Sequence, residues 1–207
     1  MRFLDKIRTV IQKINSIDEK LNKVQQSIGR LEKRQISIQK PKHFVDHEFQ
    51  VFSQWGEEGL IQYIIENIKI EKTIFVEFGV DKYLEASTRF LLINNNWSGL
   101  VMDGSEQNIN LIKKEDIYWR YNLKAECAFI DKNNINALIT NNGISGDIGL
   151  LSVDIDGNDY WVWESINVIN PRIVICEYNS LWGPNLALST PYDPAFVRTK
   201  AHYSNLY

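Results

Sequence analysis

Acidic residues follow five short apolar runs of this sequence. The runs are 73–78, 99–102, 125–130, 149–155 and 173–177, and their β-branched and aromatic content is typical of buried strands. If the strands are parallel, their carboxyl ends share one edge of a sheet, where α/β proteins bind ligands. An acid in such a place is also a common helix N-cap, and this alternative stays open for Asp131. The acids at or near these ends are Glu77, Asp103, Asp131, Asp154, Asp156 and Glu177.

Asp103 has the spacing of a ribose-binding acid. It lies 24 residues after Gly79, and in dinucleotide folds an acid about 20 residues after the first turn binds the ribose hydroxyls. Residues 79–83 contain one glycine and lack the G-x-G-x-x-G pattern that lets a backbone approach a pyrophosphate. The sequence therefore disfavours a nicotinamide cofactor. It favours a cofactor without phosphates, whose positive sulfonium tolerates an acidic rim.

Asp154 and Asp156 are the candidate catalytic residues. Both follow the fourth predicted strand, and Glu177 follows the fifth. A positioned carboxylate can act as a general base toward an acceptor hydroxyl. The same oxygens suit Mg²⁺, which would orient that hydroxyl, and this stays an alternative. For Asn158 and Asp159, helix capping is the simpler interpretation.

The elements that position these acids are predicted from alternating helical and strand patterns after residue 53. Five short strands joined by helices predict an α/β fold with a doubly wound, mostly parallel, Rossmann-like sheet. We therefore interpret residues 53–207 as one globular domain, and residues 41–52, which begin with Pro41, as a linker. The predicted helices are 57–68, 84–94, 105–115, 133–142 and 160–168.

Residues 1–40 carry a heptad pattern. Apolar residues alternate four and three apart, which predicts a coiled-coil helix and a homo-oligomer. β-branched residues occupy both the a and the d core positions, which disfavours a coiled coil of two helices. In a parallel pairing, Lys13 faces Asp18 of a partner helix. A helix folded back on its own domain is the alternative. The core residues are Phe3, Ile7, Val10, Ile14, Ile17, Leu21, Val24, Ile28 and Leu31.

Charge is divided unevenly along the chain. Residues 1–40 hold ten Lys/Arg and four Asp/Glu, which leaves thirteen against twenty-two in the rest. The basic segment could meet a membrane surface, nucleic acid or an acidic partner, although a solvated helix face is the commoner explanation. The acidic remainder argues against a nucleic-acid substrate. No apolar run is long enough to span a membrane and no signal peptide is recognisable, so we expect a cytoplasmic protein.

Four segments taken in order resemble one family. They are SQWGEEG at 53–59, FVEFG at 75–79, NWSGLVMDG at 96–104 and LLSVDIDGNDY at 150–160. Together they resemble bacterial class I S-adenosylmethionine-dependent methyltransferases of the FkbM-like type, over about residues 52–207. The resemblance implies a seven-stranded methyltransferase sheet, S-adenosylmethionine as methyl donor, and often an oxygen of a glycan or small metabolite as acceptor.

The resemblance also implies roles for individual residues. Glu77, Phe78 and Gly79 match the motif beside the methionine part of the cofactor. Asp103 and Gly104 match the ribose-binding motif, and Asp131 is expected near the adenine. Asp154 and Asp156 match the motif beside the methyl group and acceptor. The family often has a second glycine near position 81, where this chain has Asp81.

Two expectations follow from the implied strand order 3-2-1-4-5. Cys127 and Cys176 would lie on opposite edge strands, roughly 19 Å apart, so both should be free thiols. Five strands are two fewer than the family's seven, and residues 179–207 show no strand pattern, so we expect the sheet to lack its last strands. The alternatives to a methyltransferase are a nicotinamide- or nucleotide-binding enzyme and a catalytically inactive coiled-coil scaffold.

Overall fold

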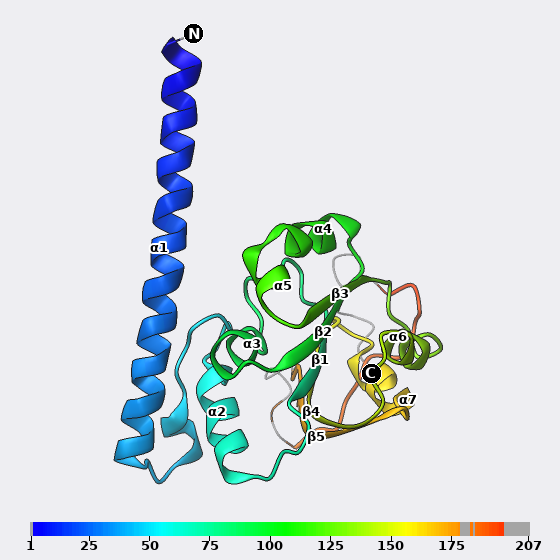
Figure 1. The fold of residues 1–207 in the computed structure, drawn as a ribbon. Helices are drawn as coiled ribbons and strands as arrows, with labels where there is room; N and C mark the ends of the chain where they lie inside the picture. The colour runs from blue at the N-terminus through cyan, green and yellow to red at the C-terminus, as the bar shows by residue number, and fades with distance from the viewer. Residues whose placement is uncertain (1, 179–182, 184, 197–207) are drawn as a thin grey trace. The chain divides into compact units, whose positions relative to one another are not determined.

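A computed structural model of the 207-residue chain describes residues 2–178, 183 and 185–196. The side chains of residues 2–5, 15 and 18 lie outside this description, and with them the predicted pairing of Lys13 with Asp18. The chain forms two compact units, Met1–Asn67 and Ile68–Tyr207, and each is described by itself. Figure 1 traces both.

Unit 1 contains α1 (Arg2–Gln39), the 3₁₀ turn η1 (Phe44–His47) and α2 (Glu57–Asn67). The predicted long N-terminal helix is thus confirmed. Two contacts tie α1 to the rest of the unit. The side-chain amide of Gln25 donates to the carbonyl of Val51, and the ammonium of Lys33 lies 3.1 Å from the carboxylate of Glu66.

The motif at residues 53–59 stabilises the start of α2. Glu58 is buried, and its carboxylate accepts hydrogen bonds from the backbone amides of Phe52 and Ser53 at 2.5 and 2.6 Å. The Ser53 hydroxyl donates to the same carboxylate and accepts from the amide of Glu57 at 3.1 Å. This arrangement satisfies orphan amides at a helix N-terminus, so the described contacts of the motif are structural.

Unit 2 is built on a five-stranded, all-parallel sheet of order β3-β2-β1-β4-β5. This confirms the predicted α/β fold and strand order. Its helices are α3 (Arg89–Asn95), α4 (Glu106–Lys114), α5 (Asp116–Arg120), α6 (Ile135–Asn141) and α7 (Asp159–Ser165). The strands are β1 (Ile74–Phe78), β2 (Ser98–Asp103), β3 (Leu123–Cys127), β4 (Gly146–Val153) and β5 (Ile169–Cys176).

Helices cover both faces of the sheet, as the drawing of unit 2 in Figure 1 shows. On one face, Val76 and Phe78 of β1 share a buried cluster with Ile135 and Ile139 of α6 and Val162 of α7. The alternate residues of β1, Phe75 and Glu77, are also buried, and helix α4 packs against β2 and β3. Burial on both faces explains why the strands are continuous apolar runs.

Several predicted boundaries are wrong. The helix predicted from residue 84 begins only at Arg89, because the preceding residues form a loop. Strand β3 ends at Cys127, so the predicted run to residue 130 is too long, and α5 was not predicted separately. Cys127 and Cys176 are free thiols, as expected. Among the described residues, no helix combines the length and apolar character needed to cross a membrane.

Candidate functional site

The carboxyl ends of the five parallel strands lie at one edge of the unit 2 sheet. The structure brings three of the predicted acids together there, since carboxylate oxygens of Asp154, Asp156 and Glu177 lie within 4.8 Å of one another. Asp103 ends β2. Asp131 does not end a strand, because β3 stops four residues earlier, at Cys127.

Gly79 brings β1 and β4 into close approach just beyond their ends. A Cβ atom at this residue would lie 1.4 Å from the carbonyl oxygen of Asp154, and the backbone has φ +79°. Its amide donates to the carbonyl of Met102 at 3.0 Å. Both the space and the left-handed backbone require glycine here. Gly79 therefore fixes the position of Asp154 relative to the first turn.

Asp103 is the centre of a hydrogen-bond network. One carboxylate oxygen accepts from the amide of Asp81 at 2.9 Å. The other accepts from the amide of Ser105 at 2.8 Å and from the side-chain amide of Asn108 at 3.1 Å. Asn108 also donates to the carboxylate of Asp81 at 2.7 Å. A carboxylate has about four acceptor positions, so these contacts leave Asp103 one for a ligand.

The loop between β1 and α3 has an unusual backbone. Asp81 has φ +48° and Tyr83 has φ +58°, a region that non-glycine residues rarely enter. At position 81 the chain thus adopts a backbone conformation that glycine favours. Asp156, beyond β4, has φ +57°. Strained residues of this kind concentrate at functional sites, where surrounding contacts hold them.

The buried carboxylate of Glu77 binds the end of this loop through hydrogen bonds. Its carboxylate accepts from the amides of Ser87 and Thr88 at 3.1 and 3.3 Å and from the Thr88 hydroxyl at 2.5 Å. Thr88 also shares a 2.9 Å hydrogen bond with the hydroxyl of Tyr83. Burial raises the pKa of Glu77, while these hydrogen bonds oppose the rise. Glu77 therefore acts on the described structure as a buried anchor.

The predicted cofactor residues Phe78 and Gly104 differ in exposure. The Phe78 side chain is fully buried in the core, which leaves only its backbone for a ligand. Gly104 is exposed, and a Cβ atom there would lie 3.5 Å from the ring of Phe129. Phe129 is 59% exposed and follows β3, so the edge also carries an apolar ring.

Asp131 is engaged in a local turn. Its carboxylate accepts from the amides of Asn133 and Asn134 at 2.7 and 2.9 Å, and its carbonyl accepts from the amide of Ile135 at 3.2 Å. These are the bonds of a residue that organises a helix start. Asp131 thus organises the turn that leads into α6, whose N-cap residue is Asn134, and a role near adenine stays a prediction.

The pKa of Asp154 is raised to about 7. Loss of solvation around its carboxyl is the main cause, followed by repulsion from Glu177 and Asp156. The same surroundings raise the pKa of the Cys176 thiol to about 11, so that group stays protonated at neutral pH. A carboxyl with a pKa near 7 can exchange a proton under physiological conditions. The three carboxylates of Asp154, Asp156 and Glu177 could also hold a divalent cation.

Asp159 shapes the turn that presents these acids. Its carboxylate accepts from the amide of Ile155 and from the amide of Gly157, both at 2.7 Å. These bonds hold the turn before α7 and do not cap the helix, and the N-cap residue Asn158 makes no side-chain cap hydrogen bond, so the capping interpretation of the two residues is wrong. Buried Asn158 donates its side-chain amide to the carbonyl of Asp193 at 2.7 Å. The turn is therefore stabilised by Asp159 and by the bond between Asn158 and Asp193.

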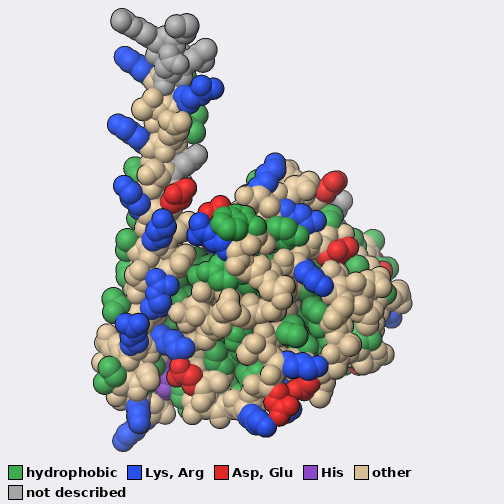
Figure 2. All heavy atoms as spheres, viewed as in Figure 1, with side chains coloured by type: hydrophobic (Ala, Val, Ile, Leu, Met, Phe, Trp, Pro, Cys, Tyr) green, Lys and Arg blue, Asp and Glu red, His purple; other side chains and the backbone are tan. Residues whose placement is uncertain are grey.

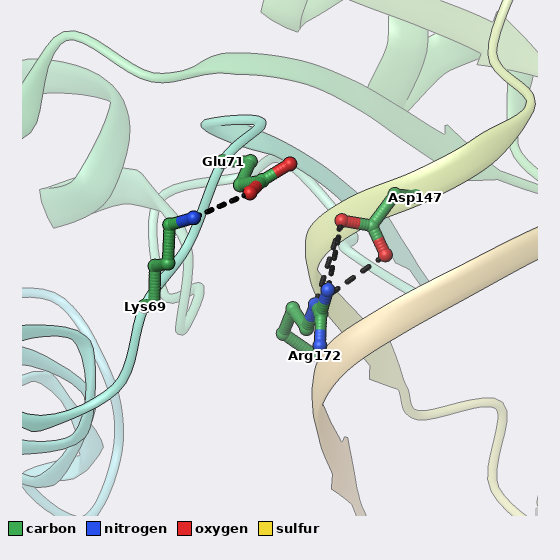
Figure 3. Close-up of polar contacts among 4 residues, drawn as sticks. All are labelled: Lys69, Glu71, Asp147 and Arg172. Atoms are coloured by element: carbon green, nitrogen blue, oxygen red, sulfur yellow. Dashed lines mark hydrogen bonds and ion pairs between the residues drawn. The ribbon is translucent and has the colours of Figure 1, made fainter.

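Two ion pairs of unit 2 lie toward the amino ends of the strands. Figure 3 shows Lys69 with Glu71, 2.7 Å apart just before β1, and Arg172 with Asp147, 3.4 Å apart near the start of β4. Acidic charge is neutralised there by neighbouring cations. At the carboxyl ends of the strands, Glu177 and Asp156 repel the carboxylate of Asp154 and contribute to its raised pKa.

Comparisons of the chain with protein-family models, with curated proteins and with solved structures found no match. The fold is nevertheless Rossmann-like. Strand order 3-2-1-4-5 with helices on both faces is consistent with binding a nucleotide-type cofactor at the carboxyl edge.

Three contributors to this site were missed in the sequence. Asn108 comes three residues after the N-cap Ser105, so its place on the first turn of α4 was readable, but its contact with Asp81 was not. Thr88 carried no signal, because the loop before α3 was predicted as helix. Phe129 was assigned to the interior of a strand that ends earlier.

Proposed function

We propose that unit 2 is an S-adenosylmethionine-dependent methyltransferase that acts on a hydroxyl oxygen of a glycan or small metabolite. The observation that carries the proposal is the network at the end of β2. Asp103 retains an acceptor position, and Asp81 stands in the left-handed backbone conformation of the glycine that it replaces. The resemblance of four ordered segments supports the same conclusion.

The residues present fit this cofactor. Asp103 would accept a hydrogen bond from a ribose hydroxyl at its remaining acceptor position, with Gly104 leaving space beside it. Gly79 and the backbone of Phe78 would lie against the methionine part, in the loop that Glu77 anchors, and Asp131 near the adenine. The clustered carboxylates favour a positive sulfonium electrostatically. The same acids would repel the two phosphates of a nicotinamide dinucleotide.

When bound, S-adenosylmethionine supplies an electrophilic methyl group. The protein's part is to hold the acceptor oxygen in line and to take up its proton. Asp154, with its pKa of about 7, is the proposed general base. Asp156 is the proposed second catalytic residue, which helps to keep the pKa of Asp154 high by repulsion. If Mg²⁺ takes part, Asp154, Asp156 and Glu177 would hold it.

We further propose that residues 1–40 join copies of the chain into a homo-oligomer. The apolar heptad residues of α1 from Ile7 to Leu31 are exposed, as expected of a surface that binds another copy. Two free cysteines fit a reducing cytoplasmic location.

Methyl transfer from tritium-labelled S-adenosylmethionine tests the proposed activity. A panel of hydroxylated glycans and small metabolites should yield labelled product with the parent chain and far less with Asp154→Asn. Enhanced NADH fluorescence without methyl transfer would favour a nicotinamide enzyme. If neither cofactor binds, the inactive-scaffold alternative is the better account.

A further inference from the structure

The heptad core residues of α1 form an exposed apolar stripe. The eight described members are between 41% and 61% exposed, so the rest of unit 1 leaves them accessible to water. A contiguous stripe of this kind on a protein surface usually marks an interface. Its members are Ile7, Val10, Ile14, Ile17, Leu21, Val24, Ile28 and Leu31.

The remaining residues of unit 1 contact α1 mainly on a face other than that of the apolar stripe. Gln25 bonds to Val51, Gly29 is buried, and Lys33 pairs with Glu66. Lys33 and Ile36 also line a cavity of about 410 Å³ within this unit. At about 100° per residue, Gly29, Lys33 and Ile36 lie roughly 100–160° around the helix from the apolar stripe, whereas Gln25 holds an e position at its margin. The contacts made within unit 1 therefore leave the a and d positions of the stripe uncovered.

We infer that the stripe is the core of a parallel, three-stranded coiled coil formed by three copies of this chain. This inference rests on the proposed homo-oligomer and adds its strand number and orientation. The stripe of each copy would thus pack against helix α1 of two further copies.

The shape of the core side chains favours three strands. In two-stranded parallel coils leucine is preferred at the d position, whereas β-branched residues at both a and d shift the preference to three or four. Here the d positions hold Val10, Ile17 and Val24 ahead of Leu31. The neighbouring e position holds Ile11, which is 51% exposed and widens the stripe. A wider stripe buries more of its area between three helices than between two.

Charge at the flanking positions favours the parallel orientation. The g positions of the five heptads hold Lys6, Lys13, Lys20, Ser27 and Arg34, and all five are exposed or partly exposed. Antiparallel helices place g beside g, which would align cations with cations. Parallel helices place g beside the e position of a neighbour, so Ser27 meets Glu32 and the cations at g are not aligned with one another. Figure 2 shows the basic side chains spaced along α1 beside hydrophobic ones.

Light scattering on the full chain tests the number of strands. The parent should have three times the chain mass of 24.1 kDa at micromolar concentration. Leu21→Asp, which buries a charge in the core, should give the mass of one chain. Gln12→Asp adds the same charge at an exposed f position and should keep the mass of three chains.

A parent mass of two or four chains would overturn the three-stranded arrangement but leave the homo-oligomer standing. A monomeric parent would overturn both.

Cysteine cross-linking tests the orientation without disturbing the charge. In a Cys127→Ser, Cys176→Ser background, Ile7→Cys should form an interchain disulfide on oxidation, because parallel copies bring residue 7 to one level. Mixed samples of Ile7→Cys and Leu31→Cys chains should form only like-with-like disulfides. Disulfides between unlike chains would show an antiparallel coil and overturn the inference.

Discussion

The carboxylate of Asp103 combines structural and ligand-binding capacity. It accepts hydrogen bonds from Asp81, Ser105 and Asn108, which ties the first turn of the sheet to the start of α4. These donors fix the direction of its remaining lone pair. A preorganised acceptor loses little entropy when a ligand binds, so the network should contribute to affinity beyond the single contact.

Asn108→Ala should weaken binding of S-adenosylhomocysteine by about 2- to 10-fold, because it removes bonds of roughly 0.5–1.5 kcal/mol that orient Asp81 and Asp103. Asn110→Ala, an exposed position on the same helix, is the matched control and should bind like the parent. Calorimetric titration measures both. Equal affinities for the two variants would show that the bridge by Asn108 has no part in cofactor binding.

Asp154 should give methyl transfer a pH dependence. A general base must be deprotonated, so kcat/KM should rise with pH and level off above a pKa of about 7. The raised pKa also means that the folded chain holds this proton more tightly than the unfolded chain. Its stabilising contribution is complete below about pH 4 and is lost as pH rises through about 7. Asp154→Asn should lower kcat at every pH, and a persistent inflection near pH 7 in that variant would exclude Asp154 as its source.

At the scale of elements, the loop between β1 and α3 is held from two directions. Glu77 accepts hydrogen bonds from Ser87 and Thr88 beneath it, and Gly79 lets the β1 end approach Asp154. The left-handed residues Asp81 and Tyr83 persist because these contacts over-determine the loop.

Gly79→Ala should destabilise the chain by roughly 2–4 kcal/mol, because it adds a clash with the Asp154 carbonyl to an unfavourable backbone conformation. Gly146→Ala is the matched control. Gly146 has a similar φ of +70°, but nothing lies within 4 Å of its added Cβ, so it should cost only about 1–2 kcal/mol. Urea unfolding at one protein concentration measures the difference. Equal losses would mean that the close approach to Asp154 is not energetically important.

The sheet was predictable from sequence because burial on both faces leaves an unmistakable pattern. Continuous apolar runs such as 149–155 correspond to a central strand, β4 (Gly146–Val153). The loop before α3 was not predictable. Leu84 and the residues after it have helical periodicity, but the buried carboxylate of Glu77 binds the amides of Ser87 and Thr88 and keeps the segment open until Arg89.

The site itself was predicted in part. Parallel strands guarantee that acids at their ends share an edge, which is why the strand pattern of the sequence was enough to group Asp154, Asp156 and Glu177. Contacts between distant residues, such as Asn108 with Asp81, depend on the register of helix α4 over the sheet edge. The spacing of residues in the sequence does not predict that register.

At the scale of the whole molecule, the two proposed surfaces belong to different units. The apolar stripe lies on α1 in unit 1, and the candidate cofactor site lies at the sheet edge of unit 2. Charge divides less sharply between them, since residues 1–67 hold eleven basic and nine acidic residues and residues 68–207 hold twelve and seventeen. The proposed functions of the two units should therefore be separable.

Leu21→Asp should abolish self-association while changing the affinity for S-adenosylhomocysteine by less than about 2-fold, because substitutions at sites that share no partner are usually independent. Light scattering and calorimetry on the same sample measure the two properties. A large loss of affinity in the monomeric variant would show that the cofactor site depends on a neighbouring copy.

The binding of S-adenosylhomocysteine to the parent chain and to Asp103→Ala tests the central claim most directly. Loss of hydrogen bonds to a charged acceptor, about 1.5–3 kcal/mol each, should weaken binding by about 10- to 150-fold. A thermal melt of the same samples separates this effect from the loss of the bonds to Asp81 and Ser105, which should lower the melting temperature as well. Calorimetry that finds no binding to the parent, or equal binding to a folded Asp103→Ala protein, would contradict the account.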